Sequence, residues 1–309
     1  MRTTTALPRK AVAAVLAAAT FSAMAGVAPA AAEASPTAAH AWQNNALDLR
    51  KAITVQVLKR LFEDGDVSVV DRHIRPDYIQ HNPLAPNGTA ALKALAGPLN
   101  AQFPDLKYDI KRVIAEGDLV LVHSNVILTP GTRGSAVVDI FRFDRNNMIA
   151  EHWDTVQEVP ATSVSGNDMF STVSSPRTNQ PGPRWLTAFT KPVATAYFDQ
   201  LLVRKDTGAI DYLAPEYHQH NPAVPSGSAG LRELFTALFQ QFPQLTVERK
   251  RVIAEGGIVA IHSHYRTSPE DRGQSVVDIF RVCQDGKICE HWDVVQNVPA
   301  TSANDNTMF

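Results

Sequence analysis

The stretch Val137-Val138-Asp139-Ile140-Phe141-Arg142, followed after a short break by Ile149-Ala150-Glu151-His152-Trp153-Asp154, decides the fold of this chain. Both runs are rich in β-branched and aromatic residues, and the break contains the turn-forming pair Asn146-Asn147. This pattern predicts a β-hairpin. Because side chains alternate between the faces of a strand, we expect His152 and Asp154 on one face and Glu151 and Trp153 on the other.

The hairpin pattern occurs a second time, at residues 276–281 and 288–293. Residues 78–170 align with residues 217–309 at a constant offset of 139, and 49 of the 93 aligned positions are identical. A single repeat of this length indicates a tandem duplication of a whole domain and excludes a solenoid of short repeats.

Each copy has helical patterns first and strand patterns afterwards, which predicts an α+β domain with an antiparallel meander. In the first copy we expect helices at 46–62, 67–74 and 89–103, an extended stretch at 78–83, and strands at 108–115, 119–128, 135–143 and 148–159. The predicted domains are residues 46–170 and 185–309, joined by a linker at 171–184 that contains three prolines and a glycine.

Composition favours a globular protein of two domains, because the chain has 309 residues, 44% apolar residues and a net charge of −2. Nothing in this charge balance favours a nucleic-acid partner, and we expect none.

The N-terminal residues 1–32 have the features of a signal peptide: a basic start, an apolar run at 11–27 and an Ala28-Pro29-Ala30 cleavage site. A retained membrane anchor is the alternative, but the run is rich in alanine. No other apolar run is long enough to cross a bilayer. We therefore expect an exported, secreted protein without stable membrane association after cleavage, whose residues 33–45 form a disordered leader.

The two cysteines, Cys283 and Cys289, flank the turn of the second hairpin. A two-residue turn at Asp285-Gly286 would place their sulfurs on opposite faces, whereas a three-residue turn would let them bond. The sequence leaves both arrangements open.

The hairpin strands carry ionisable residues at positions where apolar ones are expected: Asp139, His152 and Asp154, matched by Asp278, His291 and Asp293. A carboxylate among Val, Ile and Phe needs a partner or a raised pKa. An acid beside an imidazole on an apolar wall is a plausible proton-transfer site, although a solvated sheet face has the same pattern.

Other polar residues shared by the copies have more than one interpretation. His123 and His262 are either half-buried histidines that hydrogen-bond to a neighbouring residue or substrate-binding residues. The turn residues His81-Asn82 and His220-Asn221 fit backbone capping or a pocket, and Trp153 and Trp292 fit a core or a pocket wall. We interpret Glu116 and Glu255 as surface caps.

Metal and cofactor chemistry is not predicted. His218-x-His220 and His262-x-His264 could ligate a metal, but the first copy has Ile79 and Asn125 at two of these positions. The chain also lacks a glycine-rich nucleotide loop and a Gly-x-Ser-x-Gly elbow.

Taken together, Tyr78-x-Gln-His-Asn-Pro83, Gln102-Phe-Pro-Asp105, Asp139-Ile-Phe-Arg142 and Glu151-His-Trp-Asp154 resemble the SnoaL-like polyketide cyclases of the nuclear-transport-factor-2-like superfamily. The resemblance covers nearly all of both domains. It implies cone-shaped domains, each a curved sheet closed by about three helices around an apolar cavity. It also implies pairing sheet to sheet, which the two domains would imitate as an intramolecular pseudo-dimer.

The resemblance further implies an aldol-type cyclisation of a small carbonyl compound without metal or cofactor. By motif, Asp154 and Asp293 match the acid–base aspartate, and His81, His220, His152 and His291 would orient or polarise carbonyl groups. We assign Asp139, Asp278, Asn82, Asn221, Trp153, Trp292, His123 and His262 to substrate binding. The alternatives are a non-catalytic, exported small-molecule binding module and a structural pseudo-dimer with vestigial pockets.

Overall fold

The computed structural model describes residues 38–175 and 177–309, with side chains from Asn44 onward. The predicted signal peptide lies outside the described residues, as do residues 33–37. The rest of the leader prediction was wrong, because helix α2 begins at Ala38 and residues 38–45 are helical. Three alanines among residues 38–41 explain the extension, since alanine has the highest helix propensity.

The first domain follows the predicted order of elements. Its helices are α2 (Ala38–Phe62), α3 (Ser68–His73) and α4 (Thr89–Gln102), and its strands are β1 (Ile74–Gln80), β2 (Lys107–Glu116), β3 (Leu119–Ile127), β4 (Ser135–Phe143) and β5 (Ile149–Glu158). Apart from the start of α2 and both ends of the extended stretch, which was predicted at 78–83 and is the strand Ile74–Gln80, these bounds match the predicted ones to within one residue.

The second domain repeats this order with shorter helical pieces. Its helical elements are η1 (Arg184–Leu186), α5 (Thr187–Phe198), the π-helical turn η2 (Asp199–Val203), η3 (Thr207–Tyr212) and α6 (Ser228–Gln241). Its strands are β6 (Leu213–Gln219), β7 (Thr246–Glu255), β8 (Ile258–Arg266), β9 (Gln274–Val282) and β10 (Ile288–Asn297).

The two sheets have equivalent strand orders, β1-β5-β4-β3-β2 and β6-β10-β9-β8-β7. The predicted α+β class and the antiparallel meander are confirmed. One feature is added: β1 pairs in parallel with β5, and β6 with β10, so both sheets are mixed. This pairing brings the Gln-His-Asn-Pro segment next to the hairpin strand that carries His152 or His291.

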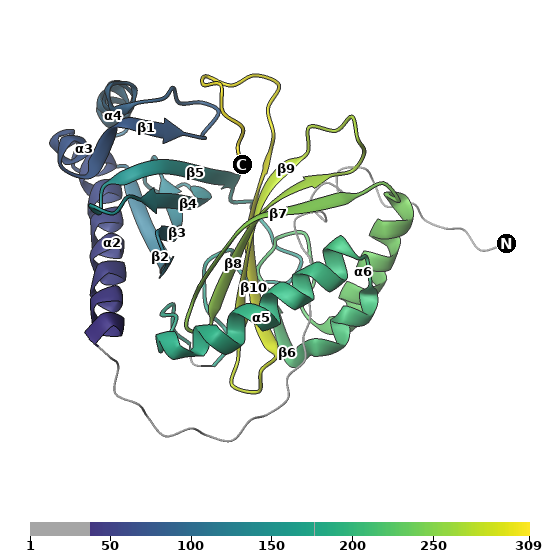
Figure 1. Ribbon diagram of the computed structural model, residues 1–309. Coiled ribbons are helices and arrows are strands. Elements are labelled where there is room, and N and C mark those ends of the chain that lie inside the picture. The colour runs from purple at the N-terminus through teal and green to yellow at the C-terminus, as the bar shows by residue number, and fades with distance from the viewer. Residues whose placement is uncertain (1–37, 176) are drawn as a thin grey trace.

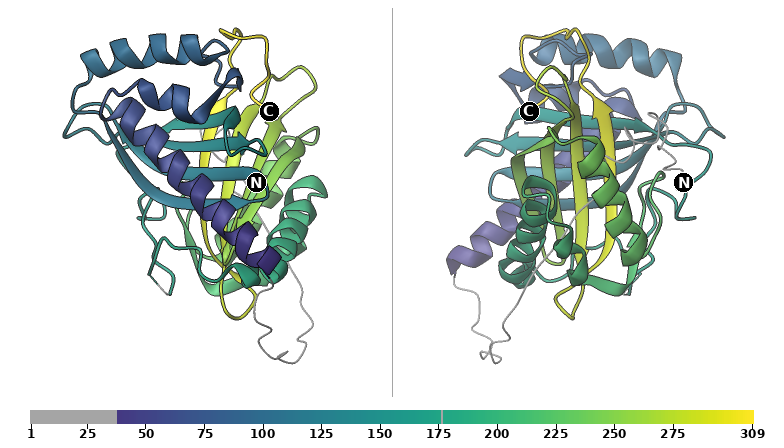
Figure 2. Two further views of the ribbon diagram at one scale, coloured as in Figure 1. Left: turned by 60° about the vertical axis from the view of Figure 1, so that its left-hand side comes forward. Right: turned by 90° about the vertical axis from the view of Figure 1, so that its right-hand side faces the viewer.

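Each sheet is covered differently on its two faces. Tyr78 and Phe141 pack in an apolar cluster with the helices of their own domain. Trp153 instead belongs to a cluster that contains Ile279 and Trp292 of the other domain. Figure 1 shows the two sheets between α2 on one side and α5 and α6 on the other, and Figure 2 shows their strands crossing.

Two glutamates make reciprocal contacts between the domains. Glu116 accepts a hydrogen bond from the backbone N–H of Ala254, and Glu255 accepts one from Ala115, each at 2.9 Å. Each also pairs with a lysine of the other domain, Lys191 with Glu116 and Lys51 with Glu255. The interpretation of these glutamates as surface caps was wrong.

The C-terminal segment of each domain lies over the Gln-His-Asn-Pro segment of the other. Asn306 donates a hydrogen bond to the carbonyl of Gln80, and Asn167 donates one to the carbonyl of Gln219. Because residues 167 and 306 are equivalent in the duplication, the two domains exchange their tails symmetrically.

Cys283 and Cys289 form a disulfide across a three-residue turn, which is one of the two arrangements that the sequence left open, and a bulge that was not predicted completes the geometry. The backbone N–H of Cys283 bonds to the carbonyl of Lys287, which encloses a three-residue turn whose Gly286 has a φ of 75°. The register then shifts between Ile288 and Glu290, so Cys289 lies in a β-bulge. The bulge turns its sulfur toward Cys283.

None of the helices in the described part of the chain is long and apolar enough to span a membrane.

Candidate functional site

An Asp-His-Asp triad lies on the helix-covered face of each sheet. In the first domain Asp139 of β4 is directly opposite Asp154 of β5. His152 lies two residues before Asp154 on β5, so its side chain points to the same face. His152 Nε2 is 3.0 Å from Asp139 Oδ1. All three residues are buried, at 3–8% exposure.

The end of β1 holds this triad in place. The Oε1 atom of Gln80 accepts a hydrogen bond from His152 Nδ1 at 3.0 Å, and Gln80 Nε2 donates to the hydroxyl of Tyr78. Asn82 Nδ2 donates to Asp154 Oδ2 at 2.5 Å. Alternation along β1 explains why Tyr78 and Gln80 point to the same side.

Two carboxylate oxygens of the first triad have no hydrogen-bond partner among the described residues. They are Asp139 Oδ2 and Asp154 Oδ1, and both are buried. An ionised carboxylate oxygen without a partner is costly in a protein interior. The first triad therefore has two buried carboxylate oxygens whose capacity to accept hydrogen bonds is unused among the described residues.

The second triad is the same in residue type but fully paired. Tyr265 donates its hydroxyl hydrogen to Asp278 Oδ2 at 2.9 Å, and Asn221 Nδ2 lies 2.8 and 2.9 Å from the two oxygens of Asp293. The position equivalent to Tyr265 in the first domain is Val126, which has no hydroxyl. Asp278, His291 and Asp293 are 0–1% exposed.

The first triad favours a charged histidine. Burial alone would lower the pKa of His152, but the hydrogen bond to Asp139 and the charges of Asp154 and Asp139 outweigh it and raise that pKa. Burial also raises the pKa of Asp154, against the opposing effects of His152 and Asn82. Asp154 is therefore a stronger base than an exposed aspartate.

The second triad favours neutral groups. Burial lowers the pKa of His291 to about 4 and raises the pKa of Asp293 to about 8. Burial also raises the pKa of Asp278 well above its usual value. His291 Nδ1 donates to Gln219, so Nε2 of the neutral ring accepts from protonated Asp278.

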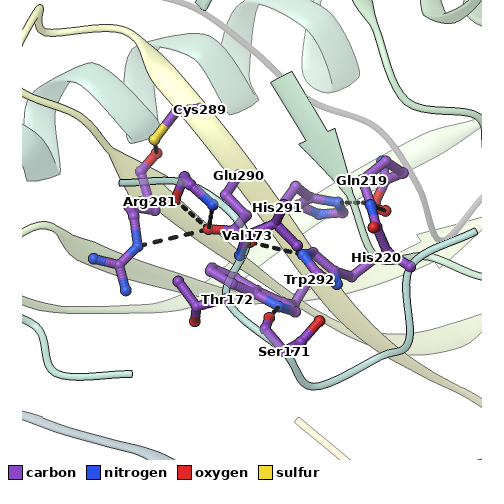
Figure 3. A network of polar contacts seen from close by, with 12 residues as sticks. Ser171, Thr172, Val173, Gln219, His220, Arg281, Cys289, Glu290, His291 and Trp292 are labelled. Carbon is purple, nitrogen blue, oxygen red and sulfur yellow. Dashed lines mark hydrogen bonds and ion pairs between the residues drawn. The ribbon is translucent and has the colours of Figure 1, made fainter. Parts of the chain in front are cut away.

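The structure separates several predicted site residues from the triads. His81 stacks on Trp153, bonds to Glu151 Oε1 at 2.8 Å and donates from Nδ1 to the carbonyl of Thr307. All of these groups lie on the face toward the other domain. Figure 3 shows the equivalent arrangement of His220, Glu290 and Trp292 in the second domain.

His123 and His262 also lie on the face between the domains. His123 Nδ1 accepts a hydrogen bond from Arg112 at 3.1 Å, and His262 Nδ1 accepts one from Arg251 at 3.0 Å. Burial, with the arginine charge second, lowers the pKa of both rings well below the ordinary value. They are held by neighbours, and they do not contact the triads.

Of the predicted residues, the structure thus brings together Asp139, His152, Asp154 and Asn82 in the first domain, and Asp278, His291, Asp293 and Asn221 in the second. Sequence reasoning missed Gln80 and Gln219, with Tyr78, Tyr217 and Tyr265. For Gln80 and Tyr78 the signal was available, because a Tyr-x-Gln alternation places both side chains on one face of an extended segment.

These triads are also the residues that could hold a metal ion. The ligand atoms of Asp139, His152 and Asp154 lie within 4.8 Å of one another, as do those of Asp278, His291 and Asp293. Two carboxylates with an imidazole whose other nitrogen is fixed are a reasonable donor set for a divalent cation. In the second domain Tyr265 and Asn221 already occupy the carboxylate oxygens. The absence of a metal remains a prediction.

A family comparison bears directly on these domains. The model of the SnoaL-like domain matches the chain twice, at residues 55–152 and 194–291. The chain belongs to the SnoaL-like family. Each match contains one Gln-His-Asn-Pro segment and the hairpin histidine, and SnoaL-like domains bind small-molecule substrates. The resemblance stated from the motifs is confirmed.

Solved structures match one SnoaL-like domain at a time. A candidate polyketide cyclase from Acidithiobacillus ferrooxidans is 25% identical, covering 35% of this chain and 87% of its own, with a TM-score of 0.30. TsrD from Streptomyces laurentii is 18% identical over 36% and 88%, with a TM-score of 0.30. A candidate SnoaL-like isomerase from Agrobacterium tumefaciens is 10% identical over 37% and 98%, with a TM-score of 0.32. No curated protein matches the chain.

Proposed function

We propose that the protein is an exported, cofactor-independent cyclase or isomerase that acts on a small apolar carbonyl compound at the first triad. The observation that carries this proposal is the pair of buried, unpartnered oxygens, Asp139 Oδ2 and Asp154 Oδ1. Membership of the SnoaL-like family supports the class of chemistry.

The proposed reaction is an intramolecular aldol addition. Asp154 takes a proton from a carbon next to a carbonyl group, and the His152 cation offsets the charge of the resulting enolate. The enolate carbon then bonds to a second carbonyl carbon of the same molecule. The alkoxide formed there takes the proton back from Asp154. Substrate and product have the same atoms, so no oxidant, reductant or cofactor is consumed.

The second triad is proposed to be closed and inactive. Tyr265 donates a hydrogen bond to Asp278, and Asn221 donates to Asp293. The carboxyl groups of this triad therefore have all their hydrogen-bond partners within the protein. A carboxyl group that is already protonated cannot act as a base.

Native mass spectrometry of the protein purified from its host tests the proposal. We expect one small molecule bound per chain, because only the first triad has free acceptors. Val126→Tyr, which copies Tyr265 into the first domain, should remove that molecule, whereas the conservative Val126→Ile should retain it. Two molecules per chain would contradict the closed second site. A binder that never converts any ligand would favour the alternative, a non-catalytic binding module.

Export is proposed from the N-terminal sequence, and the Cys283–Cys289 disulfide supports an oxidising compartment. We expect the secreted protein to begin between Ala31 and Glu33, just after the Ala-Pro-Ala site. N-terminal sequencing of protein recovered from the medium checks this. A sequence that starts at Met1 would show that the segment is retained.

We also propose that the two domains stay together in solution as an intramolecular pseudo-dimer. The reciprocal Glu116 and Glu255 contacts and the apolar cluster around Trp153 and Trp292 support it. For a compact chain of this size the radius of gyration should be about 19 Å. Small-angle scattering measures it, and a clearly larger value with the profile of two separate bodies would contradict the proposal.

A further inference from the structure

The linker between the domains binds to a polar site on the second domain, here called the Glu290 site: Arg281, Glu290 and Trp292. Glu290 accepts hydrogen bonds from the backbone N–H groups of Val173, at 2.5 Å, and Ser174, at 3.2 Å. The hydroxyl of Ser174 also donates to Glu290. Trp292 Nε1 donates to the carbonyl of Ser171 at 2.8 Å. Figure 3 shows the linker crossing these side chains.

The first domain has the same residues at the equivalent positions, here called the Glu151 site: Arg142, Glu151 and Trp153. His81 and Arg142 bond to Glu151, as His220 bonds to Glu290. Among the hydrogen bonds of the described residues, however, no backbone N–H group donates to Glu151. Its side chain is 13% exposed and that of Arg142 is 37% exposed, against 0% and 6% for Glu290 and Arg281.

Trp153 provides an independent sign that this site lacks a partner. Its ring lies under the guanidinium of Arg251 at 3.6 Å, just as the ring of Trp292 lies under Arg112 at 3.6 Å. Yet the indole N–H of Trp153 is buried and has no acceptor among the described residues. The indole N–H of Trp292 has the Ser171 carbonyl. A buried donor without an acceptor costs stability, which a bound carbonyl group would restore.

We propose that the Glu151 site binds an extended segment of a partner protein, in the way that the Glu290 site binds the linker. The linker defines the chemistry of that segment. One residue of the segment accepts a hydrogen bond from the indole N–H of Trp153 through its carbonyl oxygen. The second and third residues after it donate their backbone N–H groups to the carboxylate of Glu151. The third residue after it is a serine or threonine, whose hydroxyl also reaches the carboxylate.

This surface is distinct from the triads, because Glu151 and Trp153 lie on the opposite face of β5 from His152 and Asp154. A serine- or threonine-containing peptide could therefore bind without entering the first triad. The proposal does not depend on the proposed catalytic function.

Appending the linker sequence Ser-Thr-Val-Ser-Ser after Phe309 tests the site at high effective concentration, because Phe309 is equivalent to Phe170, which precedes Ser171. We expect the melting temperature to rise by about 2–4 °C, the shift that roughly 1 kcal/mol gives in a chain of this size. The indole N–H resonance of Trp153 should move, while that of Trp292 stays in place. The four tryptophans make assignment by substitution practical.

The matched control is the appended sequence Ser-Thr-Pro-Pro-Ser, which removes the two N–H donors and should produce neither effect. Glu151→Gln in the extended chain should also cancel the rise. The free peptide acetyl-Ser-Thr-Val-Ser-Ser-Pro should cause the same Trp153 shift when added to the unmodified chain. An unchanged Trp153 resonance with both the appended and the free peptide would overturn the proposal. Concentration-dependent dimers that Glu151→Gln abolishes would also overturn it, since the occupant would be a second copy.

Discussion

Asp154→Asn is expected to lower the rate of turnover about 10²–10⁴-fold, whereas Asp293→Asn leaves the rate at its wild-type value. The amide keeps the shape of the carboxylate but cannot take a proton, and loss of a general base typically costs that much. Asp293 is buried, paired with Asn221 and has a pKa of about 8, so its replacement removes no base. The measurement is turnover of the compound that native mass spectrometry identifies.

The pH dependence provides a second readout of the same group. The pKa of Asp154 is raised, so the rate should fall with decreasing pH at values above the ordinary 3.9 of aspartate. Ligand affinity should change much less than turnover in Asp154→Asn, because the amide still packs and bonds. Full activity in Asp154→Asn, or a loss confined to Asp293→Asn, would refute the assignment of the working site.

Trp292→Ala should reduce the free energy of unfolding by about 3–5 kcal/mol, the usual range for truncating a buried tryptophan. Trp292 is 0% exposed, lies against the guanidinium of Arg112 and bonds to the linker carbonyl of Ser171. Its loss would leave a cavity and a buried arginine without its aromatic partner. Because this cluster joins the domains, the variant should also expand in solution.

The matched control is Trp185→Ala, since Trp185 is 67% exposed. Surface substitutions usually change stability by less than about 0.5 kcal/mol. Urea unfolding followed by circular dichroism compares the two variants. Equal midpoints for both would mean that the contact between the domains contributes little to stability.

Much of the fold could be predicted from the sequence because it depends on local patterns. The two-residue period of residues 135–143 and 149–158 predicts the hairpin and places His152 and Asp154 on one face. The constant offset between residues 78–170 and 217–309 predicts that the two domains have the same fold. The start of α2 was missed, since an alanine-rich segment is compatible with both a leader and a helix.

The candidate site could be predicted only in part. Alternation along a strand assigns side chains to two faces, but it does not say which face the helices cover and which face the other domain covers. Helices cover the face with Asp139, His152 and Asp154, and the second domain covers the face with His81, His123 and Trp153. A histidine in a turn or strand therefore had the same sequence signal in either place. The disulfide depended on a bulge at Cys289, which is set by the register of β9 and β10.

By itself, the sequence determined the duplicated α+β domains and the hairpins, because both follow from spacing along the chain. Only the tertiary structure decided which of two identical triads has free oxygens. Val126 and Tyr265 are ordinary strand residues in the sequence. The difference between them matters only in the folded chain, where the hydroxyl oxygen of Tyr265 lies 2.9 Å from Asp278 Oδ2. A hydroxyl group at that distance donates a hydrogen bond to the buried carboxyl group, which the methyl groups of a valine cannot do.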